Sequence, residues 1–285
     1  MQFAIVSSST SLRTVSNFVE FLAATIREYC GGAPLVLAHD DREQLRTPPK
    51  CLVFALGQGL APFRVPDMTY VVFLNFSVLY HVKWWPLPSA RATRLIRQKR
   101  RRFLARLPAI DRVLDFYPPH GELLEARFPE KYGGVFPVAG YAAPVPFAPL
   151  SGTKYDVCTI GSETPRRRRV WVALGRRGLS LSPRTGVLEE LMPQCRVTAN
   201  VHTERYANCE SHRILSSLAH GRAVVSERLF GFAEANCWPS VLQHPRWRIP
   251  GTIVKVLSDP SCADALARDA YEFYWNRYWP AARER

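Results

Sequence analysis

Two segments in the second half of the chain combine residue types that can bind an anion. The first is YDVCTIGSETPRRRR, in which an apolar strand ends at Gly161 and Ser162 and a helix begins near Pro165. The free amides and positive dipole of a helix N-terminus favour phosphate, and arginines 166–169 are unfavourable in that first turn without a nearby anion. The segment predicts an anion site that uses residues such as Arg166 and Arg169; a solvated basic helix face is the alternative.

The second segment is TANVHTERYANCESHRILSSLAHGRAVVSE, which has the same strand, loop and helix order. Its strand ends at Asn200 and His202, and Asn208 is a natural N-cap for the helix that follows the polar loop. Glu210 and Arg213 lie three positions apart and therefore share one face of that helix. This segment predicts a second set of free amides beside a charged pair; an ordinary surface ion pair is the alternative.

Alternating strands and helices must position these segments. Continuously apolar runs, typical of parallel strands covered on both faces, occur at 3–6, 35–38, 51–56, 70–76, 112–116, 155–160, 179–181, 196–201 and 223–226. Helical spacing occurs at 14–29, 91–107, 121–128, 166–175, 209–220, 253–257 and 263–279. Such α/β alternation predicts a parallel sheet in each half of the chain, with a ligand cleft at the carboxyl ends of the strands.

The composition indicates a folded, basic chain of two domains. It has 285 residues, 47% of them hydrophobic, and a net charge of +14, which favours anionic partners. A Pro-, Ala- and Gly-rich stretch at 137–149 divides it into domains 1–145 and 146–262. The tail 263–285 carries an aromatic stripe at helical spacing, which predicts a face packed on the protein rather than a ligand platform.

Membrane and metal signals are weak in this sequence. The most apolar run, 70–80, is far shorter than the roughly 20 residues that cross a bilayer. The seven cysteines are dispersed with no C-x-x-C pair, which argues against a disulfide framework or a zinc site and suits a reducing cytoplasm. We therefore expect a cytoplasmic protein with no transmembrane segment and no bound metal.

Three ordered segments resemble a known family. N-x-H followed by E-x-x-R-I-L-x-x-L-A-x-G-x-x-V-V-S-E, the YDVCTIGS-x-x-x-RRR run and VFPVAGYAAPV together resemble the CgeB-like, group-1 glycosyltransferases of the GT-B fold. The resemblance covers about residues 130–280. It implies two Rossmann-like domains with parallel sheets facing a central cleft, a C-terminal helix that crosses back to the N-terminal acceptor domain, and metal-independent transfer from a nucleotide-sugar donor.

The resemblance also assigns residues to the donor. Gly161 and Ser162 would approach its diphosphate, assisted by one of the arginines 166–169. Asn200 and His202 would line the cleft floor. Glu210 and Arg213, with Asn208 and Ser211 beside them, would lie near the diphosphate or the ribose. One departure concerns the two glutamates that many group-1 enzymes place eight positions apart on this helix, because Asn208 and Ser216 occupy those positions here. The ribose contact is then missing or supplied elsewhere, by Glu210 or Glu227.

The general base that an inverting enzyme needs is not evident in the sequence. His120, His81 and Asp115 follow strands of the N-terminal domain, where cleft loops are expected. A structural role is the alternative for each of them.

A strongly basic helix is predicted at 91–106, with eight basic residues and no acidic one. A solvated surface is one interpretation. The others are a phosphate-rich acceptor, either DNA, whose phosphates would give salt-dependent affinity, or an anionic lipid-linked molecule. The sequence thus supports a glycosyltransferase with an unidentified acceptor, the same chemistry on modified DNA bases as in phage enzymes, or a non-catalytic module that binds nucleic acid or a partner.

Overall fold

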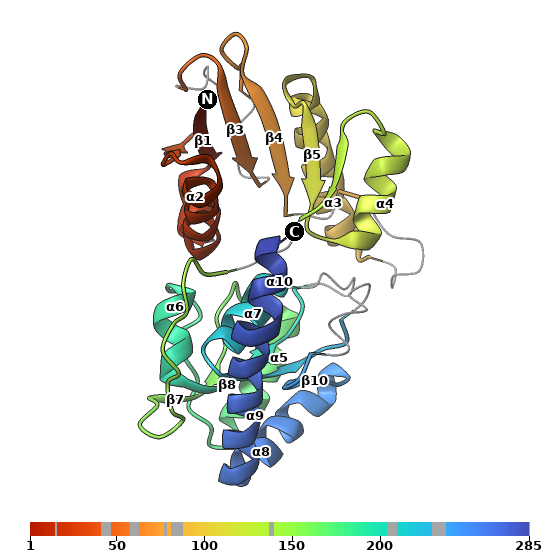
Figure 1. The fold of residues 1–285 in the computed structure, drawn as a ribbon. Coiled ribbons are helices and arrows are strands. Elements are labelled where there is room, and N and C mark those ends of the chain that lie inside the picture. The colour runs from red at the N-terminus through yellow and green to blue at the C-terminus, as the bar shows by residue number, and fades with distance from the viewer. Residues whose placement is uncertain are drawn as a thin grey trace. The chain divides into compact units, whose positions relative to one another are not determined.

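The fold comes from a computed structural model of the 285-residue chain. It describes residues 1–14, 16–40, 47–57, 63–76, 79–80, 88–136, 140–203, 210–229 and 238–284. The chain divides into two compact units, Met1–Ala142 and Ala143–Arg285 (Figure 1). This division lies close to the expected domain boundary after residue 145.

The first unit is built on a six-stranded parallel sheet of order β2-β1-β3-β4-β5-β6. Its strands are β1 (Gln2–Ser7), β2 (Leu35–Ala38), β3 (Cys51–Leu56), β4 (Tyr70–Asn75), β5 (Arg112–Asp115) and β6 (Tyr132–Val135). Its helices are α1 (Ser9–Thr14), α2 (Ser16–Cys30), α3 (Ala90–Arg106) and α4 (Pro118–Arg127), with a short 3-10 turn at Leu107–Ala109. The central strands β1, β3 and β4 supply most of a continuous apolar core, as expected for strands covered on both faces.

The second unit is built on a four-stranded parallel sheet of order β10-β9-β8-β7. Its strands are β7 (Tyr155–Cys158), β8 (Cys195–Asn200), β9 (Ala223–Ser226) and β10 (Val241–Gln243). Its helices are α5 (Pro165–Gly175), α6 (Leu188–Leu191), α7 (Ser211–Ala219), α8 (Ile249–Ser258), α9 (Pro260–Phe273) and α10 (Trp279–Glu284), with a π-helical turn at Tyr274–Tyr278 and 3-10 turns at Met192–Gln194 and Arg246–Arg248.

The predicted fold class, two α/β domains with parallel sheets, is confirmed, and several elements differ in detail. The strand expected at 179–181 is reduced to a single parallel bridge between Leu181 and Val157. The edge strands β6 and β10 were not predicted, because half-exposed runs such as YGGV and VLQ lack the apolar density of the inner strands. The predicted cleft between the domains stays a prediction.

The aromatic stripe of the tail packs on the protein, as predicted, and its contacts lie within the second unit. That the tail crosses back to the N-terminal domain stays a prediction. Tyr274 is fully buried, and Trp275 donates its indole N–H to the carbonyl of Ala219 at 2.9 Å. Tyr271 donates its hydroxyl to the carbonyl of Val145 at 2.7 Å. The end of α7 is therefore fixed against the C-terminal helices.

Gly221 closes α7 at a point where no other residue fits. Its φ is +64°, and a Cβ there would lie 2.5 Å from the ring of Phe147 and 2.9 Å from the carbonyl oxygen of Ala267. The glycine therefore allows the interdomain segment and α9 to pack against the turn that leads into β9.

Within the described ranges, none of the helices combines the length and the apolar character that crossing a bilayer demands.

Candidate functional site

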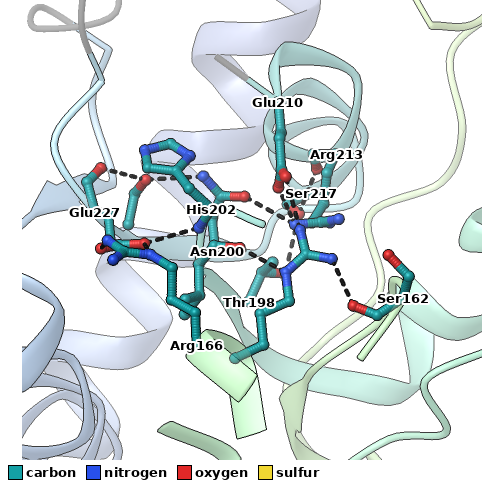
Figure 2. A network of polar contacts seen from close by, with 12 residues as sticks. Ser162, Arg166, Thr198, Asn200, His202, Glu210, Arg213, Ser217 and Glu227 are labelled. Atoms are coloured by element: carbon teal, nitrogen blue, oxygen red, sulfur yellow. Dashed lines mark hydrogen bonds and ion pairs between the residues drawn. The ribbon is translucent and has the colours of Figure 1, made fainter. Parts of the chain in front are cut away.

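The carboxyl ends of β7, β8 and β9 bring the two predicted anion-binding segments together. These three strands are neighbours in the second sheet, so the turns after them share one edge. Figure 2 shows polar side chains from these turns and from α5 and α7 in one connected set of contacts. We call its five charged members the arginine–glutamate network: Arg166, Arg167, Arg213, Glu210 and Glu227.

The turn after β7 is shaped by Gly161. Its φ is +124°, a conformation that favours glycine. A Cβ at this position would lie 2.7 Å from Nη2 of Arg213 and 2.9 Å from Nη1 of Arg167. Any larger residue would therefore push both guanidinium groups away from the turn.

Helix α5 starts immediately after this turn. Thr164 is its N-cap and accepts a hydrogen bond from the amide of Arg167 at 3.3 Å. Pro165 occupies the first helical position, where the missing N–H costs nothing. The start of the helix is thus fixed by local sequence, and its first turn carries Arg166 and Arg167 into the site.

Arg167 joins the two turns directly. Only 2% of its side chain is exposed, and its guanidinium donates to the carbonyls of Val201 at 2.7 Å and Ser162 at 3.0 Å. A third bond reaches Oε1 of Glu210 at 2.7 Å. Burial lowers the pKa of Arg167, and the charge of Glu210 raises it. The turns after residues 160 and 200 are therefore held around one buried cation.

Glu210 bridges Arg167 to a second guanidinium, that of Arg213. One carboxylate oxygen contacts each arginine. Arg213 also donates to Oδ1 of Asn200 at 2.9 Å, and Asn200 donates in turn to Oγ of Ser226 at 2.9 Å. These contacts connect the helix N-terminus of α7 to the ends of β8 and β9 (Figure 2).

Glu227 forms the other half of the network. Its carboxylate accepts hydrogen bonds from the guanidinium of Arg166 and, at 2.8 Å, from the amide of His202. The Nε2 atom of His202 lies 3.1 Å from the carbonyl oxygen of Arg228. Arg166 keeps 21% of its side chain exposed, so this end of the network reaches solvent.

The charges of the network do not balance. Three arginines face two glutamates, which leaves one positive charge among the five groups. Glu210 and Arg213 are 16% and 14% exposed, so a ligand can reach them. An excess of cationic hydrogen-bond donors at a water-depleted surface is chemically suited to a phosphate or diphosphate.

Most of the predicted donor residues meet at this edge of the sheet. They are Gly161, Ser162, Arg166, Asn200, His202, Glu210 and Arg213. Ser211 is the first residue of α7 and is buried. Asn208 lies outside the described residues.

Arg169 is exposed and has no contact with the arginine–glutamate network among the described residues, so its predicted role at the donor stays a prediction. It lines a cavity of about 570 Å³ together with Arg168 and Arg176. At about 100° per residue, Arg169 lies about 60° from Arg166 and about 160° from Arg167 around the helix axis. Its side chain therefore points away from the buried face that carries Arg167.

Two members of the network were not singled out as donor residues: Arg167 entered the prediction only as one of four arginines, and Glu227 only as an alternative contact to the ribose. A signal for Arg167 does exist in the sequence. It shares the buried face of α5 with Val170, Trp171 and Leu174, at the spacing i, i+3, i+4 and i+7. A charged residue at an inward-facing position needs partners, so the periodicity could have selected Arg167 from the four arginines.

A contrasting cluster occupies the ends of β4 and β5 in the first unit. We call Asn75, Asp115 and His120 the first-unit triad; at most 1% of any of the three is exposed. Asp115 accepts from Asn75 at 2.5 Å and lies 2.8 Å from Nδ1 of His120. The Nε2 atom of His120 accepts from the amides of Leu79 and Tyr80 at 3.1 and 3.2 Å.

The contacts of the first-unit triad argue against His120 and Asp115 as the general base. Both ring nitrogens of His120 are engaged, and Asp115 also accepts from the amide of Tyr117 at 2.7 Å. Neither group offers a free basic atom to a substrate in this structure, so the contacts support the structural alternative for both. His81 lies outside the described residues.

No metal centre is assembled by the described part of the chain. Its His, Cys, Asp and Glu side chains form no group of three or more that could hold an ion. Metal independence stays a prediction.

Comparison with known proteins relates this fold to glycosyltransferases. No protein-family model matches the chain, and no curated protein matches it in sequence. Among solved structures, Anabaena HepE in complex with UDP and glucose matches with a TM-score of 0.61 at 11% identity, over 100% of this chain and 97% of HepE. WaaG, a glycosyltransferase involved in lipopolysaccharide biosynthesis, matches with a TM-score of 0.58 at 11% identity, over 99% and 97%.

A third similar structure is longer than this chain. S. aureus TarM, solved in a complex that includes UDP and alpha-GlcNAc-glycerol, has a TM-score of 0.56 at 9% identity. The match covers 82% of this chain and 54% of TarM, so the chain spans about half of that protein's length. At these identities the likenesses show the fold, which is the GT-B architecture of two α/β domains with parallel sheets and long C-terminal helices. They do not single out the CgeB-like group.

Proposed function

We propose that this protein is a glycosyltransferase that takes a hexose from a nucleotide sugar, with UDP-glucose the first donor to test. One observation carries the proposal: a buried arginine, Arg167, joins the two strand-end turns of a GT-B-type second domain and leaves that site with excess positive charge. The UDP complexes of HepE and TarM support the choice of donor class.

The proposed roles follow from the charge of the leaving group. When the anomeric carbon is displaced, the nucleoside diphosphate gains negative charge, and hydrogen-bond donors fixed at that position lower the barrier. Arg166 and Arg213, which are partly exposed, would contact the diphosphate. Arg167 would hold the turn that presents the amides after Gly161. Guanidinium groups and helix dipoles would then supply the charge that a divalent ion supplies in other enzymes.

The site also bears on the alternative of a non-catalytic module. That alternative rested on the two glutamates replaced by Asn208 and Ser216. Glu210 and Glu227 place two carboxylates at the same edge of the sheet, where either can accept hydrogen bonds from a donor hydroxyl. The missing glutamates therefore do not leave the site without carboxylates.

Isothermal titration with UDP, GDP, TDP and their glucose conjugates tests the proposal. We expect binding of at least one of them, and release of the nucleoside diphosphate in an acceptor-free hydrolysis assay. The Arg213→Ala variant should lose binding. Arg177→Ala is the matched control, because Arg177 is exposed just beyond the C-terminal end of α5 and its guanidinium donates to the carbonyl of Ala173 at 2.8 Å. A folded wild-type protein that binds none of these compounds would overturn the proposal.

A further inference from the structure

Helix α3 presents an exposed surface that is rich in arginine. Five arginines of this helix are exposed, and we call them the α3 arginine face: Arg91, Arg94, Arg97, Arg101 and Arg102. The helix contains no acidic residue to neutralise them. Its other side, with Ala92, Ile96 and Phe103, is buried in the core of the first unit. Core packing therefore fixes which side of α3 meets the solvent.

The arginine face is narrow and elongated. At about 100° per residue, its five positions fall within an arc of about 140°. From Arg91 to Arg102 the helix rises about 16 Å at about 1.5 Å per residue. Like charges held this close repel one another, so they gain free energy when a polyanion lies along them.

Two further arginines lie at the border of this face. The ring of Tyr80 has the guanidinium of Arg100 at 5.5 Å and that of Arg127, from α4, at 4.5 Å. Burial raises the pKa of Tyr80, and the two arginines lower it. Cation–π contacts with Tyr80 hold both guanidinium groups in place next to the arginine face.

We propose that the α3 arginine face binds the sugar–phosphate backbone of a nucleic acid. Seven of the eight basic residues of α3 are arginines, whose planar fork matches phosphate oxygens bidentately. Their linear arrangement complements a strand of phosphates. This surface belongs to the first unit, whereas the arginine–glutamate network belongs to the second. The inference therefore goes beyond the proposed sugar transfer and does not depend on it.

A lipid surface fits the same helix less well. A helix that lies on a bilayer inserts its apolar face between the lipids. The apolar residues Ile96 and Phe103 are committed to the protein core instead. Leu104, 41% exposed, is the one large apolar side chain among the exposed positions of α3. The face thus offers charge without an apolar anchor.

The test is binding of a fluorescently labelled 30-base-pair DNA duplex, followed by anisotropy over a range of KCl concentrations. Five phosphate contacts predict a slope of about −4.5 for the logarithm of the association constant against the logarithm of salt. The triple variant Arg91→Gln, Arg94→Gln and Arg101→Gln should reduce the slope by about 2.7. We expect its affinity at 100 mM KCl to fall at least about tenfold.

A control variant distinguishes binding at the α3 arginine face from attraction by the net charge of the protein. Arg27→Gln, Arg177→Gln and Arg268→Gln together remove the same charge from exposed positions on α2, just after α5, and on α9. This control should keep most of the affinity and the slope. Circular dichroism spectra and thermal unfolding midpoints verify that both triple variants are folded.

Three outcomes overturn the inference. The first is the absence of duplex binding by the wild-type protein at 50 mM KCl. The second is an equal loss of affinity in the two triple variants, which would indicate attraction by net charge alone. The third concerns cosedimentation with vesicles that contain 30% anionic phospholipid. If the α3 arginines are required for this cosedimentation but not for DNA binding, the face binds a membrane instead. Loss of DNA affinity in the α3 variant alone supports the inference.

Discussion

The molecule carries two polar clusters at the carboxyl ends of parallel strands, and they differ in charge balance and in access. The first-unit triad is buried: at most 1% of each residue is exposed, and among the described residues the polar contacts of Asp115 and His120 are all internal. The arginine–glutamate network of the second unit has one more cation than it has anions, and three of its side chains are 14–21% exposed.

Position at the end of a strand is therefore not sufficient to make a ligand site. In the triad, the donors and acceptors satisfy each other and hold the segment at residues 79–80 against α4. In the network, the described residues pair three guanidinium groups with two carboxylates, which leaves one excess positive charge at a surface that solvent reaches. Uncompensated charge has a cost in the folded protein, which a bound anion would remove.

The largest expected effect follows removal of Arg167. The Arg167→Ala variant breaks the bonds to Ser162, Val201 and Glu210, so both turns lose their common anchor. We expect UDP affinity to fall about 100-fold or more, equivalent to roughly 3 kcal/mol. Titration calorimetry measures the loss.

Arg167→Lys serves as the conservative comparison for this variant. Lysine keeps the charge but cannot reach three acceptors with a planar fork, so its affinity should lie between wild type and alanine. Wild-type affinity in a folded Arg167→Ala protein would show that the network is structural in the same way as the triad.

The opposite pattern is expected for Asp115. The Asp115→Asn variant places an amide NH₂ group among the donors of Asn75, His120 and Tyr117. We expect the free energy of unfolding to fall by about 2–3 kcal/mol, with unchanged UDP affinity in the folded protein. Urea denaturation and titration calorimetry measure the two quantities. A specific loss of UDP affinity at unchanged stability would contradict the structural role.

A smaller effect on stability is expected when Glu210 is changed, and its size should depend on whether UDP is bound. Glu210→Gln removes the negative charge between Arg167 and Arg213. We expect a loss of about 1–2 kcal/mol in stability, seen as a lower Tm without ligand. The phosphates of UDP would replace the missing charge, so saturating UDP should raise the Tm more in this variant than in wild type. Equal Tm shifts in both proteins would contradict this account.

The same contrast explains what the sequence could predict. Buried strands are apolar along their whole length, so both sheets and the strand-end turns near residues 160 and 202 could be located in advance. The helical periodicity of residues 166–175 could have identified Arg167 as the inward-facing arginine, whereas the choice among the strand-end acids required side-chain directions. Asp115 and Glu227 both follow apolar strands, and only the tertiary contacts distinguish the satisfied carboxylate from the one beside excess cations. Glu227 gains its partner from α5, 61 positions earlier in the chain, which no local pattern reveals.

The smallest expected effects on UDP affinity compare two arginines of α5, one inside the arginine–glutamate network and one outside it. Arg166 and Arg169 carry the same charge three positions apart, but Arg166 pairs with Glu227 while the exposed Arg169 lines the cavity of about 570 Å³. Arg169→Ala should change UDP affinity less than about twofold, because an exposed charge outside the arginine–glutamate network is screened by water and salt. Arg166→Ala should weaken UDP binding about tenfold, the effect of about 1.4 kcal/mol. Calorimetry at 150 mM KCl measures both affinities. Equal losses of UDP affinity in the two variants would mean that UDP binding depends only on the total charge of α5. The distinction between an ordered network and a basic surface would then fail.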